Sequence, residues 1–61
     1  MTEESLIRFA DELTTLYGDE GETEVWLDSL EDLRALSTLF VARGLGAEVN
    51  FAKQTLTVRF K

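Results

Sequence analysis

The eleven residues TEVWLDSLEDL, Thr23–Leu33, contain the change of hydrophobic period that decides the fold. In the first half of the stretch, Val25 and Leu27 alternate with polar residues, which is the period of a half-buried β-strand. From Ser29 onward the apolar residues recur at three- and four-residue spacing, which is the period of an amphipathic helix. Ser29 is also a favourable N-cap residue. The stretch therefore predicts a strand over 23–28 that passes directly into a helix.

The apolar residues of this helix cover more than half of its circumference, which predicts contacts on two sides, with a sheet and with another helix. They are Leu30, Leu33, Leu36, Leu39, Phe40 and Val41. Gly44 suits the left-handed position just after a helix, and Leu45 would complete a Schellman-type cap there.

An earlier helix is predicted between Thr2, a favourable N-cap, and Gly18. Glu3 and Glu4 place negative charge in its first turn, where the helix dipole favours it. Its apolar residues again recur at helical spacing: Leu6, Phe9, Ala10, Leu13, Leu16 and Tyr17.

The last segment, AEVNFAKQTLTVRFK, alternates twice and predicts a β-hairpin. Val49 and Phe51 point one way in its first strand, and Leu56, Val58 and Phe60 share one face of its second. The residues between them, 52–55, are expected to form the loop.

These elements predict a single α+β domain over residues 1–61, in the order α-β-α-β-β. Two helices are expected on one face of a three-stranded antiparallel sheet of strand order 1-3-2, with the last strand in the middle. The expected shared core is Leu13, Val25, Leu33, Phe40, Val49, Phe51, Leu56 and Val58. The other face is expected to be open, and to carry Trp26 among polar residues: Glu24, Asp28, Glu48, Asn50, Thr55, Thr57 and Arg59.

The charge of the chain is strongly asymmetric. The net charge is −6, but residues 1–32 hold 11 of the 12 acidic residues with one Arg, and residues 33–61 hold one acidic residue with five bases. A field of this sign repels nucleic acid and anionic membranes, so a basic protein surface is the expected partner. The chain also has no Cys, no long apolar run and an acidic start, which predicts a soluble cytoplasmic protein.

Enzyme chemistry has little support in the sequence. Without His or Cys, a nucleophile would have to be Ser5, Ser29 or Ser37, and no base is spaced to activate any of them. The carboxylates between Asp19 and Glu24 lack the ligand spacing of an EF-hand loop. We therefore expect neither catalysis, nor a metal, nor a cofactor.

The acidic residues allow two interpretations. Helix capping and solubility account for those in the first turns of the helices. Alternatively, the charges along the first helix, the following loop and the first strand form a negative surface that imitates nucleic acid or docks on a basic groove.

Trp26, the only tryptophan, also allows two interpretations. It could pack over cross-strand neighbours such as Thr57 and Arg59, with a cation–π contact to the latter. It could instead anchor an interface with a partner or with a second copy of the chain, since Trp is enriched at binding hot spots. The candidate partner-binding residues are accordingly Asp11, Glu12, Asp19, Glu20, Glu22, Glu24, Trp26 and Asp28.

Small size, strong acidity and the lack of Cys, His or a catalytic set resemble phage-encoded inhibitors, particularly anti-CRISPR proteins, several of which mimic DNA. This resemblance implies a non-enzymatic inhibitor of a basic, nucleic-acid-binding protein, a monomer or homodimer acting in the host cytoplasm. Capped helices, one short hairpin and no Pro, Cys or His also resemble de novo designed mini-proteins, which implies the alternative of no biological function.

Overall fold

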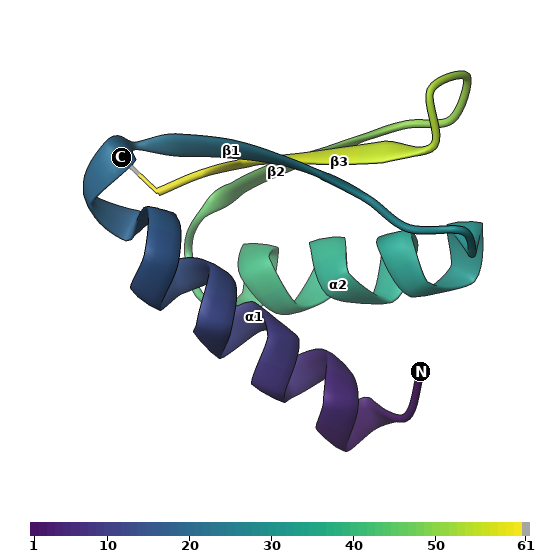
Figure 1. The fold of residues 1–61 in the computed structure, drawn as a ribbon, viewed down its shortest axis with the longest axis horizontal. Helices are drawn as coiled ribbons and strands as arrows, with labels where there is room; N and C mark the ends of the chain where they lie inside the picture. Colours follow the sequence, from purple (N-terminus) through teal and green to yellow (C-terminus); the bar gives the residue numbers. More distant parts are fainter. Residues whose placement is uncertain (61) are drawn as a thin grey trace.

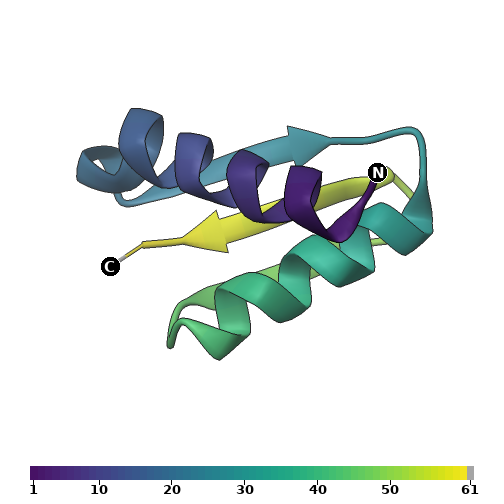
Figure 2. The same cartoon turned by 90° about the horizontal axis from the view of Figure 1, so that it is seen from below.

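The computed structural model describes residues 1–60. Their elements, in chain order, are α1 (Glu3–Tyr17), the 3₁₀ turn η1 (Gly18–Glu20), β1 (Glu22–Trp26), α2 (Leu30–Ala42), β2 (Gly46–Asn50) and β3 (Thr55–Arg59). The strands form one antiparallel sheet in the order β1-β3-β2. The predicted fold is confirmed, and Figures 1 and 2 show both helices on the same side of this sheet.

Both helices begin at the predicted N-caps. The Thr2 hydroxyl accepts a hydrogen bond from the Ser5 amide at 3.1 Å, and the Ser29 hydroxyl accepts one from the Asp32 amide at 3.3 Å. Each bond satisfies one of the amides that a first helical turn leaves without a partner. Neither helix has the length and apolar composition that crossing a membrane requires, within residues 1–60.

The end of α2 is a Schellman cap, as predicted. Gly44 has a φ of 82°. Its amide donates to the Val41 carbonyl at 2.9 Å, and the Leu45 amide donates to the Phe40 carbonyl at 3.1 Å. This pair of bonds turns the chain from α2 towards β2.

The core is one apolar layer between the sheet and the helices. Phe40 is the largest fully buried side chain, and the ring of Phe60 meets its ring edge to face with centroids 5.9 Å apart. As predicted, α2 contacts both the sheet and α1. The buried apolar residues are Leu6, Ala10, Leu13, Leu33, Leu36, Phe40, Leu56 and Val58.

Phe51 lies outside this core, so its predicted burial is wrong. Strand β2 ends at Asn50, and the hairpin loop runs over 51–54 instead of 52–55. The Asn50 side-chain oxygen accepts a hydrogen bond from the Lys53 amide at 3.0 Å, which turns the chain before Phe51 can continue the alternation. Gln54 closes the loop with a φ of 57°. Phe51 is consequently 61% exposed.

The two phenylalanines provide a matched test of this packing. Phe40→Ala should cost about 3–5 kcal/mol, because it opens a cavity in the core, and that is comparable to the whole stability of so small a domain. Phe51→Ala should change the free energy of unfolding by about 0.5 kcal/mol or less. Urea denaturation of both variants measures the difference, and an equal loss of stability in the two would contradict the observed hairpin.

Candidate functional site

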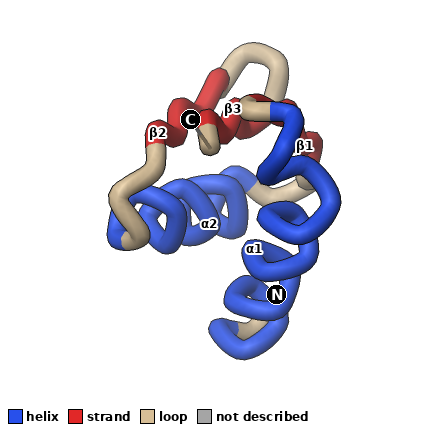
Figure 3. The backbone as a smooth tube through the Cα atoms, turned by 90° about the vertical axis from the view of Figure 1, so that its left-hand side faces the viewer, coloured by secondary structure: helices blue, strands red, loops and turns tan. Residues whose placement is uncertain are grey.

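The face of the sheet opposite the helices is the candidate site. Its residues stand in three cross-strand rows, each with its β3 residue in the middle: Glu22–Arg59–Gly46, Glu24–Thr57–Glu48 and Trp26–Thr55–Asn50. No helix covers these rows, because α1 and α2 both lie on the other side (Figure 3).

Trp26 stands at the hairpin end of this face and is 62% exposed. Its cross-strand neighbour Thr55 is only 9% exposed, although it too belongs to the open face. The Thr55 hydroxyl donates to the Glu24 carboxylate at 3.3 Å, so this buried polar group is satisfied. The large apolar side chain of Trp26 is therefore exposed to solvent, whereas the polar Thr55 beside it is buried and hydrogen-bonded.

The expected contact between Trp26 and Arg59 does not form. Arg59 belongs to the row farthest from the indole, where its guanidinium lies 3.4 Å from Glu22 and 3.9 Å from Glu48. The stem of Arg59 lies over Gly46, where a Cβ would come within 3.5 Å of the Arg59 Cβ. Within β1, β2 and β3 as described, the one cation of this face is thus engaged by two carboxylates, and the indole remains uncovered.

The face is net negative, because it combines three exposed carboxylates with a single guanidinium: Glu22, Glu24, Glu48 and Arg59. Glu48 is predicted on the open face but is not among the predicted partner-binding residues, and the structure sets it in the same row as Glu24.

A second exposed aromatic lies at the same end of the sheet as Trp26. Phe51 follows Asn50, the residue that shares a row with Trp26. The hairpin loop that holds Phe51 rises on the side of the sheet away from the helices (Figure 1). The Gln54 side-chain amide donates to the Leu27 carbonyl at 2.8 Å and ties this loop to the segment after β1.

The structure separates the other acidic candidates from this face. Asp11 and Glu12 lie on α1, on the covered side of the sheet, and Asp11 pairs with Arg43 of the α2 cap at 2.8 Å. Asp19 and Glu20 lie in η1, at the start of β1, and Asp28 follows β1. Of the eight predicted residues, only Glu22, Glu24 and Trp26 share the open sheet face.

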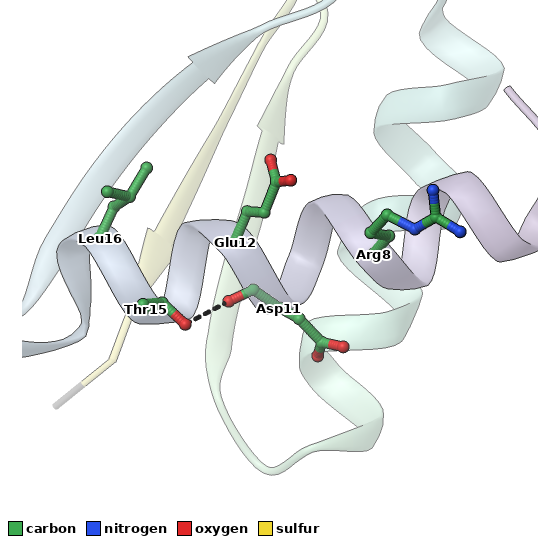
Figure 4. A pocket seen from close by; sticks show the side chains of 5 residues that line it. All are labelled: Arg8, Asp11, Glu12, Thr15 and Leu16. Carbon is green, nitrogen blue, oxygen red and sulfur yellow. Dashed lines mark hydrogen bonds between the residues drawn. The ribbon is translucent and has the colours of Figure 1, made fainter.

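A shallow hollow also lies on α1, and Figure 4 shows that a single helix supplies all of its lining. Thr15 donates its hydroxyl to the Asp11 carbonyl at 3.0 Å, and Arg8 pairs with Glu4 at 3.2 Å. Leu16 is 66% exposed at its end. A hollow lined by one helix does not enclose a ligand on several sides, as ligand pockets usually do. In residues 1–60, moreover, no three potential ligands gather in a way that could hold a metal ion.

The exposure of Trp26 can be tested directly. Trp26→Ala should lower the free energy of unfolding by about 1 kcal/mol or less, because the indole covers little of the core. In the wild-type monomer, the single tryptophan should emit at long wavelength and be quenched readily by acrylamide. A blue-shifted emission that resists the quencher, in a protein shown by ultracentrifugation to be monomeric, would contradict this site.

The comparisons with known proteins assign no function to these residues. No family model, no curated protein and no solved structure matches the chain. Its function must therefore be argued from the open face.

Proposed function

We propose that this protein is a non-enzymatic, acidic binding module whose open sheet face docks on a basic protein surface. The observation that carries the proposal is the 62% exposure of Trp26 on a face whose other large side chains are charged. In its more specific form, the module imitates nucleic acid and inhibits a protein that binds it.

The indole supplies the apolar centre that an interface needs. Tryptophan is enriched among residues whose truncation weakens binding most, and such residues work best when surrounding groups exclude water. Here Glu24 stands in the row next to Trp26, Glu48 shares that row across the sheet, and Glu22 lies one row farther along the strand. A partner that covers Trp26 would bring its own side chains against these three.

The charge of the face favours a basic partner over a second copy of the chain. A face-to-face dimer would bring three carboxylates of one protomer against three of the other, and like charges at close range disfavour association. Nucleic acid is disfavoured for the same reason, because Arg59, the cation on the described strands, is already paired with Glu22 and Glu48. Lys and Arg on a partner would instead gain favourable contacts and faster association.

A pair of double variants with the same net charge tests the location of the contact. Glu22→Gln with Glu24→Gln removes two charges from the open face, and Glu3→Gln with Glu31→Gln removes two from the first turns of α1 and α2. Both variants make the net charge of −6 less negative by the same two charges, so long-range attraction weakens equally. Affinity for purified basic nucleic-acid-binding proteins, measured as a panel at two salt concentrations, should fall much more for the first variant.

The same panel of proteins tests whether Trp26 anchors the interface and whether nucleic acid competes for the same surface. Trp26→Ala should weaken binding by about 2 kcal/mol or more, and added duplex DNA should compete with the wild-type protein. If no member of the panel binds, or if binding is indifferent to Trp26→Ala and to the choice of carboxylate pair, the proposed function is wrong.

A further inference from the structure

The outer edge of β1 carries backbone groups that the sheet does not use. The Phe60 amide donates to the Gly21 carbonyl at 2.7 Å, and these two residues continue the register in which β1 pairs with β3. Hydrogen-bonded and non-bonded pairs alternate along an antiparallel ladder. Thr23 and Val25 follow Gly21 by two and four residues. They therefore also direct their backbone N–H and C=O groups towards β3.

The intervening residues direct theirs outward. Glu22, Glu24 and Trp26 leave three amides and three carbonyls along the free edge of β1. These are also the β1 residues whose side chains lie on the open face. One strand thus offers, from the same three residues, a row of hydrogen-bonding groups, two carboxylates and an exposed indole.

The other edge of the sheet is less suited to a basic partner. The same alternation leaves only Ala47 and Val49 of β2 with outward backbone groups, and their side chains pack against the core. Bases also flank β2, with Arg43 before it and Lys53 after it. Acidic residues flank β1 instead, in η1 and at Asp28.

We propose that β1 accepts an extended basic segment of the partner as a fourth, antiparallel strand. This inference rests on the proposed function and specifies how the partner binds. In an antiparallel pair, the partner residues that bond to Glu22, Glu24 and Trp26 place their side chains on the same open face. The matching segment carries Lys or Arg at alternate positions, opposite the two glutamates.

A second copy of β1 does not match this edge. The antiparallel register that pairs all three edge residues sets Glu24 of one chain opposite Glu24 of the other. Like charges directly opposite each other destabilise a strand pair. Charged residues on an edge strand are also a common protection against self-association. The edge therefore favours a partner of opposite charge.

The covered side of the sheet offers support for the alternate residues of the added strand. Their side chains would point towards the helical layer, where α1 lies beneath β1 (Figures 1 and 3). Leu16 and Glu12 project from one side of α1 (Figure 4), and Leu16 is 66% exposed. Apolar residues between the bases of the segment would gain cover from such a flank.

The test uses a capped seven-residue peptide in which Lys alternates with Val. In the proposed strand, the Lys amides face β1 and the Val amides face solvent. N-methylation of three Lys amides should weaken binding by at least about tenfold, because it removes donors that pair with β1. N-methylation of the three Val amides is the matched control, with the same charge and the same number of methyl groups, and should leave the affinity within about twofold of the parent peptide.

Amide hydrogen exchange of the bound protein locates the strand. The amides of Glu22, Glu24 and Trp26 should become at least about tenfold slower to exchange, because the peptide hydrogen-bonds them. Those of Ala47 and Val49, on the other edge, should not change. Protection of the β2 edge instead, or equal effects of the two methylation sets, or a larger effect of the Val set, would overturn the proposal.

Two different outcomes separate strand addition at β1 from binding of a basic partner at the open face. If the unmethylated peptide binds, loses affinity on Trp26→Ala and tolerates both methylation sets, the open face binds bases without strand addition. If the peptide and the panel of basic proteins both fail to bind, the proposed function is wrong as well.

Discussion

The burial of α2 against β3 is the interaction on which the rest of the structure depends. Phe40, Leu56 and Val58 are fully buried there, and the ring of Phe60 closes on Phe40. A domain of this size builds one apolar layer, and here both helices contribute buried residues to it from the same side of the sheet. The opposite face of the sheet consequently has no cover within residues 1–60. The side chains on that face are therefore either exposed to solvent or covered by a partner.

The sequence predicts the fold well because its strongest signals are local. Caps at Thr2 and Ser29 and the turn at Gly44 each depend on neighbouring residues only. The hairpin was placed less well. A loop over 52–55 would set Phe51 opposite Leu56, whereas the structure sets Val49 there. That shift of two residues along β2 preserves the faces of the strand, since side chains alternate with a period of two, so the topology survives. The signal that was overlooked is Asn50, a residue that favours turns.

The candidate site was predicted in part, because charge along a chain does not determine which charges share a face. The sequence groups Asp11 with the acidic residues of the first strand. In the structure, Asp11 lies on α1, on the covered side of the sheet, and pairs with Arg43. Glu48 is distant in sequence and adjacent in the sheet. The exposure of Trp26 followed from period alone, whereas its separation from Arg59 depends on strand register, which the sequence left open.

The proposed interface is the open face around Trp26 together with the outer edge of β1, and it leaves α2 free. A two-dimensional ¹H–¹⁵N spectrum of the labelled protein, titrated with the tightest-binding basic protein of the panel, tests it residue by residue. The largest shift changes are expected at the indole N–H of Trp26 and at amides of β1 and β3. Changes confined to α1 and its hollow would contradict it.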